Sequence, residues 1–186
     1  MQAQATPVSV FPQTFEQFVD WEPIDGYKYE WYEDQLIRFS GMKRKQYFIY
    51  SILSDLFYEK GYQQTGTFMA EPDVMLTPKQ MRRPDIAYFT KEQIRQSRLG
   101  QDVIPPFVVE VISPTDDAEA VETKITEYFK AGVQVVWQIY PNNQLLYIYI
   151  SRKQVIICLD DDICSAAPVL PDFAIRVTEL FALPEA

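Results

Sequence analysis

Residues 107–140 read FVVEVISPTDDAEAVETKITEYFKAGVQVVWQIY, and they decide the fold. An apolar run, Phe107 to Ile112, precedes the helix start Ser113-Pro114-Thr115-Asp116-Asp117. The apolar periodicity then predicts a helix over Asp117 to Ala131, which ends at Gly132 before a second apolar run, Val133 to Tyr140. A strand, a crossover helix and a strand imply a parallel pair. We therefore predict a mixed sheet built around residues 107–140.

Hairpins and a long helix surround this unit. Before it, we expect a short helix at Phe15 to Trp21, a hairpin of Tyr27 to Tyr32 and Gln35 to Phe39, a helix from Lys43 to Lys60 ended by Gly61, and strands at Gly66 to Ala70 and Ile86 to Phe89. After it, we expect strands at Leu145 to Ile150 and Gln154 to Leu159. The expected fold class is α/β of the mixed α+β kind, with a central mixed β-sheet flanked by helices. We expect residues 1–20 to be an N-terminal extension with a short helix and residues 21–184 to form one domain.

Size and composition agree with one folded domain. The chain has 186 residues, of which 47% are hydrophobic, enough for its own core. Met1 to Val10 lacks a signal-peptide pattern, and Leu145 to Ile150 is far too short to span a bilayer. Cys158 and Cys164 fit no metal-binding spacing, so we interpret them as reduced thiols. We expect a cytoplasmic protein that does not bind membranes.

Two carboxylates are predicted to meet at the ends of buried strands. Asp85 follows Pro84 at the start of one strand, and Glu110 comes 25 residues later at the end of the run Phe107 to Val109. An ionised carboxylate beside an apolar sheet is costly to desolvate unless it is paired or binds a cation. The pair therefore suggests a shared divalent ion.

Lys124 lies on the border of the apolar stripe of the predicted helix. It is three residues from Val121 and four from Tyr128, so it can lean toward the strand that contains Glu110. The alternative is a lysine whose stem only covers apolar surface.

The residue types restrict the chemistry. The chain contains no histidine, so histidine triads and histidine-ligated zinc are excluded. Hard oxygen ligands favour Mg2+ or Mn2+. Such an ion beside a lysine would polarise a phosphodiester and activate water. Phosphodiester hydrolysis is the reaction that uses all three parts.

These motifs resemble a known family. The set comprises Arg82-Arg83-Pro84-Asp85-Ile86-Ala87, Val108-Val109-Glu110-Val111-Ile112-Ser113-Pro114, Lys124, Glu127-Tyr128, Ala131-Gly132-Val133 and, near the C-terminus, Leu170-Pro171-Asp172-Phe173-Ala174 with Leu180-Phe181. Their order and spacing resemble the PD-(D/E)XK nuclease superfamily. Within it, the chain is similar to the Uma-two family of restriction-endonuclease-like proteins, from about Trp21 to Leu183.

The resemblance implies a restriction-endonuclease-like core and a role for each matched residue. Asp85 and Glu110 would bind Mg2+ or Mn2+ together with the backbone carbonyl of Val111. Lys124 would replace the superfamily lysine, because Ile112 occupies the usual position two residues after the glutamate. Glu30 matches an additional N-terminal acidic residue, for a second ion or for orienting a ligand.

Three alternatives stay open at this stage. Relatives usually have a histidine at the start of the second helix, where this chain has Gln46, which leaves any contact made there in doubt. Pro72-Asp73 is a second candidate for the metal-binding aspartate, and both Pro-Asp steps also fit ordinary turns. Glu30 is equally compatible with an exposed position on its strand.

The net charge of the chain opposes binding to nucleic acid, whereas local basic clusters favour it. A net charge of −9 opposes binding to a polyanion. Arg82 and Arg83, and Lys43, Arg44 and Lys45, are basic clusters that we expect to gather around the carboxylates and contact phosphates. We predict a DNA endonuclease that acts as a homodimer. The competing hypotheses are a catalytically degenerate module that binds nucleic acid or protein, and an unrelated α/β protein with structural carboxylates.

Overall fold

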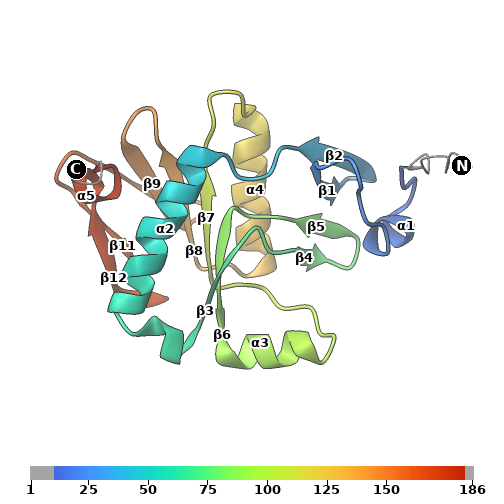
Figure 1. Cartoon of the computed structure of the whole chain (residues 1–186), viewed down its shortest axis with the longest axis horizontal. Coiled ribbons are helices and arrows are strands. Elements are labelled where there is room, and N and C mark those ends of the chain that lie inside the picture. Colours follow the sequence, from blue (N-terminus) through green and yellow to red (C-terminus); the bar gives the residue numbers. More distant parts are fainter. Residues whose placement is uncertain (1–10, 183–186) are drawn as a thin grey trace, which may run out of the picture.

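The computed structural model describes residues 11–182, and its centre is a six-stranded sheet in the order β10-β9-β8-β7-β6-β3 (Figure 1). The six strands are β3 (Gly66–Ala70), β6 (Ile86–Thr90), β7 (Phe107–Val111), β8 (Val135–Tyr140), β9 (Leu145–Ser151) and β10 (Gln154–Leu159). β7 and β8 are parallel, and the other neighbours in the sheet are antiparallel. The expected mixed sheet is therefore confirmed.

Helices cover both faces of this sheet. Helix α2 (Arg44–Glu59) lies on one face and α4 (Ala118–Ala131) on the other (Figure 1). Side chains alternate along a strand, so Phe107, Val109 and Val111 of β7 point into the core shared with α2, whereas Val108 joins the core beneath α4. The same alternation turns Glu110 toward α4.

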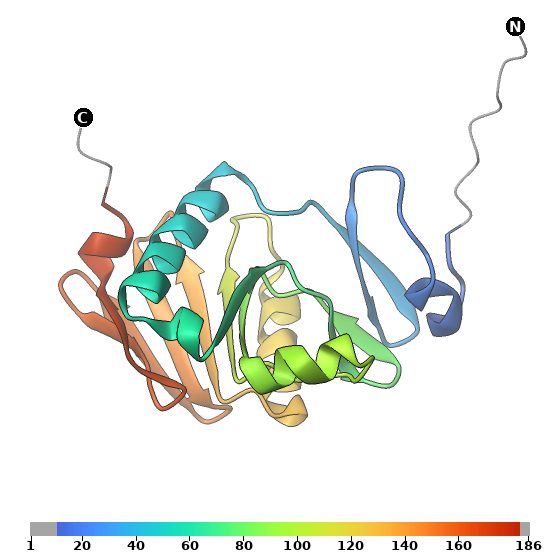
Figure 2. The same cartoon turned by 60° about the horizontal axis from the view of Figure 1, so that its bottom comes forward.

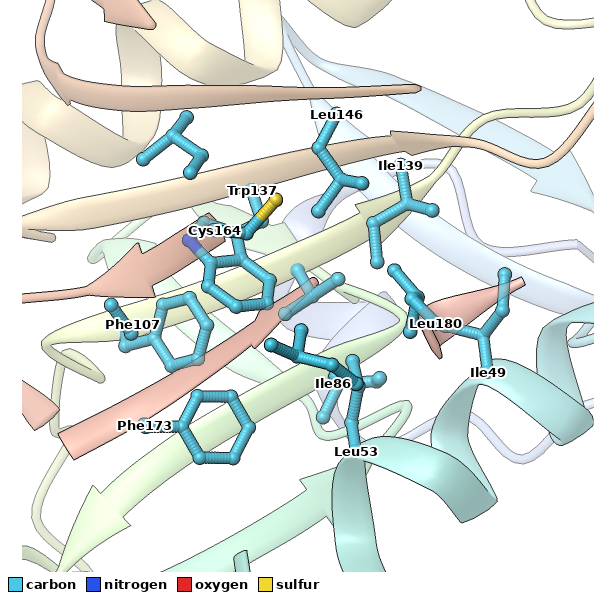
Figure 3. Close-up of a cluster of buried hydrophobic side chains, with 14 of the residues drawn as sticks. Ile49, Leu53, Ile86, Phe107, Trp137, Ile139, Leu146, Cys164, Phe173 and Leu180 are labelled. Carbon is cyan, nitrogen blue, oxygen red and sulfur yellow. The ribbon is translucent and has the colours of Figure 1, made fainter. Parts of the chain in front are cut away.

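The larger core contains a cluster of aromatic rings (Figure 3). Phe107, Trp137 and Phe173 contact one another with ring centroids 5.3 to 6.0 Å apart. Leu53 and Ile49 of α2 belong to the same core and lie near Ile86 and Leu180 (Figure 3). The contacts fix α2 on the sheet and so position the start of that helix next to the C-terminal end of β7.

Two smaller sheets lie at opposite ends of the molecule (Figure 2). One has the order β2-β1-β5-β4, and the other pairs β11 with β12. Their strands are β1 (Lys28–Tyr32), β2 (Gln35–Phe39), β4 (Val74–Thr77), β5 (Gln80–Arg82), β11 (Ile163–Ala166) and β12 (Leu170–Arg176). Helix α1 (Phe15–Val19) packs Phe15 and Phe18 against Trp31 of β1.

Most expected elements are present, with bounds shifted by one or two residues. The sequence patterns did not predict β4, β5, α3 (Lys91–Arg98), β11, β12 or α5 (Val177–Leu180). Cys158 and Cys164 are buried free thiols, as expected. Within residues 11–182, no helix has both the length and the apolar composition needed to cross a membrane. The expectation for residues 1–10, and the last residues of the expected domain, lie outside the described part of the chain.

Candidate active site

A cleft of about 680 Å³ opens where the central sheet meets the β1–β2 hairpin. The start of α2, the C-terminal end of β7 and the first two turns of α4 complete its walls. Asp85, Glu110, Lys124 and Glu30 all line this cleft. The fold therefore brings together the four side chains that the sequence proposed as catalytic.

Asp85 is fixed to the end of β7 by its own carboxylate. Its Oδ2 accepts a hydrogen bond of 2.7 Å from the backbone N–H of Val111. Its Oδ1 accepts a bond of 3.2 Å from the side-chain nitrogen of Gln46, which also donates to the carbonyl oxygen of Val111 at 3.1 Å. Asp85 and the Val111 carbonyl thus share one amide donor from α2.

Glu110 is buried beneath α4. The hydroxyl of Tyr128 donates a hydrogen bond of 2.5 Å to Glu110 Oε1. The Nζ of Lys124 lies 3.8 Å from the same oxygen. Residues 124 and 128 are one helical turn apart, so both side chains project from the same face of α4 onto this carboxylate.

Lys124 is held mainly by Glu30. Its Nζ donates to Glu30 Oε1 at 2.9 Å, and its side chain is 23% exposed, toward the cleft. Glu30 is buried on β1, which excludes the exposed position considered for it. The Lys124 side chain therefore does more than cover apolar surface, because its charge is paired inside the site.

A second pair of charges lies behind the first. Arg82 is 3% exposed, and its guanidinium donates to Glu127 Oε2 at 2.7 Å and to Glu30 Oε2 at 3.0 Å. The aromatic ring of Tyr32 covers it at 4.4 Å. We refer to Arg82, Lys124, Glu30 and Glu127 as the ion-pair network. Its two positive and two negative charges balance.

The balance within the network leaves Asp85 and Glu110 without a full counter-charge. Burial, and after it the negative charge of Glu110, raise the pKa of Asp85 to about 8. Burial also raises the pKa of Glu110, although Lys124 opposes this. The pKa of Glu30 shifts the other way. Burial raises it, but the positive charges of Lys124 and Arg82 have the larger combined effect, so the pKa of Glu30 is lowered. The two carboxylates are therefore the electrostatically unsatisfied part of the site.

These two carboxylates fit a divalent cation. They offer hard oxygen donors, and the adjacent Val111 carbonyl oxygen is a third. A charge of +2 would offset two buried carboxylates whose negative charge Lys124 only partly compensates. Within residues 11–182, no third acidic side chain joins them as a ligand. Water molecules would have to complete the coordination, as is usual for Mg2+.

The rival aspartate lies elsewhere. The Asp73 side chain is 59% exposed and forms an ion pair with Arg83. It lines a separate depression with Met69 and Phe89. Asp85 is therefore the aspartate that meets Glu110.

The expected phosphate-binding residues divide into three groups. Arg82 lines the cleft but is buried in the ion-pair network, where its guanidinium donates to the carboxylates of Glu127 and Glu30; its expected contact with phosphate stays a prediction. Arg83 lines the cleft but is paired with Asp73. Lys43 lines the cleft at the start of α2, whereas Arg44 and Lys45 do not, and Lys45 donates to Asn142.

The sequence reasoning missed two partners in the site. Tyr128 was assigned only to the apolar stripe of α4, and Glu127 was not considered as a partner of Arg82. The signal that was available is the spacing Lys124, Glu127, Tyr128, which places all three on one side of a helix. Knowing which strand faces them required the position of β1, which the sequence does not give.

Known proteins agree with this architecture. The Uma2 family model, described as "Putative restriction endonuclease", matches residues 15–178. The chain is also similar to the crystal structure of a putative nuclease belonging to DUF820 from Anabaena variabilis ATCC 29413, with a TM-score of 0.74 and 21% identity over 91% of this chain and 98% of that one. This likeness confirms the expected restriction-endonuclease-like core. No curated protein matches the chain. Because the family model spans most of its length, the chain belongs to the Uma2 family of putative restriction endonucleases.

Proposed function

We propose that the protein is a metal-dependent endonuclease that hydrolyses phosphodiester bonds in DNA. Asp85, Glu110 and the Val111 carbonyl would hold Mg2+ or Mn2+. The observation that supports this most is the pair of buried carboxylates left without a full counter-charge in a cleft of about 680 Å³. A divalent ion bound there would supply positive charge opposite a scissile phosphate.

Lys124 is the proposed catalytic cation of the chain itself. Its partly exposed side chain lines the cleft, and its Nζ lies 3.8 Å from Glu110 Oε1. From there it can hold a non-bridging phosphate oxygen or orient a water molecule. The charges of Glu110 and Glu30 outweigh its burial and raise the pKa of Lys124, which keeps it protonated.

Glu30 acts as a positioning residue in this proposal. Both of its side-chain oxygens already accept hydrogen bonds, from Lys124, Arg82 and the backbone N–H of Arg83. An oxygen that is saturated with donors is a poor ligand for a second ion. Glu30 therefore orients Lys124 and stabilises its charge.

DNA is the proposed substrate, with Lys43 and Arg83 as the phosphate contacts that remain open to the cleft. Arg44 and Lys45, in the first turn of α2, would contact phosphates of the DNA outside the cleft. We further propose that the protein acts as a homodimer in the cytoplasm. The two buried, free thiols fit a reducing compartment.

A second candidate function has a specific observation behind it. More acidic than basic side chains line the cleft, and Gln46 donates to two of the three proposed ligand oxygens. Both features suit a degenerate nuclease fold that binds nucleic acid or a protein without cutting. Turnover separates the two functions.

The test is cleavage of supercoiled and single-stranded DNA, and of RNA, in Mg2+, Mn2+ or EDTA. We expect cleavage of DNA with either ion, none in EDTA, and none by Asp85→Ala. Asp73→Ala is the matched control, because it removes the other aspartate that follows a proline, and it should cut like the wild type. DNA binding in Ca2+ without cleavage in Mg2+ or Mn2+ would instead favour the degenerate module.

A further inference from the structure

Strand β10 forms one edge of the central sheet and is unusually apolar for an edge. Val155, Ile156, Ile157 and Leu159 are each 46% to 51% exposed. The strand, QVIICL, contains no charged residue. Edge strands normally carry charges or prolines that prevent pairing with another chain. β10 lacks these protections along its whole length.

The backbone of β10 offers hydrogen bonds on its open side. Leu159 uses its N–H for Asp162 Oδ2 at 3.0 Å and its C=O for the N–H of Asp162, also at 3.0 Å. These groups of Leu159 therefore point away from β9. The N–H and C=O groups of successive residues in a strand point to opposite edges. The N–H and C=O groups of Ile157 and Val155 therefore point to the open edge, as those of Leu159 do.

Opposite charges mark the two ends of the strand. Arg152 and Lys153 precede it, and Asp160, Asp161 and Asp162 follow it. All five side chains are exposed. Within residues 11–182, Arg152, Lys153 and Asp160 take part in none of the ion pairs found. An antiparallel copy of the strand would place the basic end of one chain beside the acidic end of the other.

We propose that β10 is a self-complementary edge that pairs with β10 of a second copy of this chain. Antiparallel pairing across a two-fold axis makes each contact twice, as in other isologous dimers. The register that uses only free backbone groups centres the axis on Ile156. It pairs Val155 with the partner's Ile157 and sets Arg152 opposite the partner's Asp160. The two six-stranded sheets become one continuous sheet.

This pairing also covers the exposed apolar side chains. Val155, Ile157 and Leu159 share one face of the strand, beside Tyr147 and Tyr149 of β9. Two copies of this stripe would meet across the axis and lose contact with water. None of the residues that line the active-site cleft belongs to β10, so both clefts of the dimer stay open.

A cysteine at the two-fold axis tests the register. In the proposed dimer, position 156 faces its own copy in a non-hydrogen-bonded pair, where Cα atoms are about 4.5 Å apart and a disulfide can form. We expect Ile156→Cys to become a covalent dimer on mild oxidation. Val155→Cys, one residue away and equally exposed, should cross-link far less. The native Cys158 and Cys164 are buried, so the wild type should stay uncross-linked.

Charge exchange tests the partner. Arg152→Glu and Asp160→Arg should each weaken the dimer at least about tenfold, because each places like charges at both junctions. A one-to-one mixture of the two variants should form a heterodimer, since acids of one chain then face bases of the other. Sedimentation of the wild type, both variants and the mixture measures this directly.

An apolar substitution completes the experiment. Ile157→Lys places a charge on the edge and should leave a folded monomer. Ile24→Lys, on an even more exposed isoleucine before β1, should remain a dimer. A wild type that is monomeric at about 100 μM would overturn the proposal. So would a dimer that survives Ile157→Lys, because its interface would then lie elsewhere.

Discussion

Gln46 donates a hydrogen bond of 3.2 Å from its side-chain nitrogen to Asp85 Oδ1. The orientation of the amide is fixed at its other end, because Gln46 Oε1 accepts a bond of 2.7 Å from the backbone N–H of Lys43 at the start of α2. The nitrogen consequently points at Asp85 and at the Val111 carbonyl. A cation held by those oxygens must displace the positive end of this amide.

The first prediction follows from that competition. Gln46→Ala should bind Mn2+ about three- to tenfold more tightly, because two hydrogen bonds, each contributing roughly 0.5–1.5 kcal/mol, no longer oppose the ion. Calorimetry measures the affinity without requiring activity. Gln93→Ala is the matched control: Gln93 also accepts from a helix N-cap and donates to a carbonyl, but on α3. Weaker Mn2+ binding by Gln46→Ala would mean that the amide is itself a ligand.

Lys124 leads to the second prediction. Lys124→Met should lower nuclease turnover at least about tenfold while Mn2+ still binds, because its ammonium group acts on phosphate or water in the proposed reaction. It should also lower the melting temperature, since Glu30 loses a partner 2.9 Å away. Lys130→Met, at the exposed end of the same helix, should change neither. Full activity of Lys124→Met would remove the residue from the mechanism.

The sequence predicted the central sheet because its signals are local. Residues 107–140 contain two apolar runs, a helix with its N-cap at Asp117 and a left-handed ending at Gly132, and all of these form as expected. The short strands β4 and β5 were not predicted, because three or four residues are too few to show an alternation of apolar and polar side chains. Strands β11 and β12 could not be predicted from local periodicity either, because they are stabilised by tertiary packing against Trp137 and Phe107.

The carboxylates of the site and Lys124 were predictable from the sequence, but the buried position of Arg82 was not. Asp85 and Glu110 follow strand patterns that the sequence displays directly. Arg82 was assigned to phosphate contact because it forms a basic pair with Arg83 just before Asp85. Its burial comes from Glu127 and Glu30, which are 45 and 52 residues away. Long-range pairing of this kind leaves no local pattern in a single sequence.

The third prediction separates Arg82 from Arg83. Arg82→Ala should destabilise the protein by about 3–5 kcal/mol, because it leaves Glu30 and Glu127 buried without their partner. Arg83→Ala should cost at most about 1 kcal/mol, since its partner Asp73 is exposed. Urea unfolding gives both values. Equal midpoints for the two variants would contradict the buried network.

Arg83, which contributes little to stability, is expected to contribute to DNA binding. We expect Arg83→Ala to reduce the salt dependence of DNA binding in Ca2+ by about one unit, as for the loss of one phosphate contact. Lys79→Ala, which removes a lysine outside the cleft, is the control. An unchanged slope for Arg83→Ala would remove Arg83 from the DNA-binding surface.

The fourth prediction uses the raised pKa of Asp85, which is about 8 in the folded protein against 3.8 as its ordinary value. Between these pH values the unfolded chain has released a proton that the folded protein still holds. Folding stability in EDTA should therefore fall as pH rises from about 4 to 8. Asp85→Asn cannot ionise and escapes this loss, so its melting temperature should exceed that of the wild type more at pH 8.5 than at pH 5.

Adding Mn2+ should reverse the order of the two proteins at pH 8.5. The wild type gains stability when its carboxylates bind the ion, whereas Asp85→Asn has lost a ligand and should gain much less. Asp73→Asn, on the exposed aspartate, should follow the wild type with and without Mn2+. If Asp85→Asn and the wild type melt alike at both pH values in EDTA, the carboxylate of Asp85 is not held in an unfavourable environment. The electrostatic argument for a divalent ion would then fail.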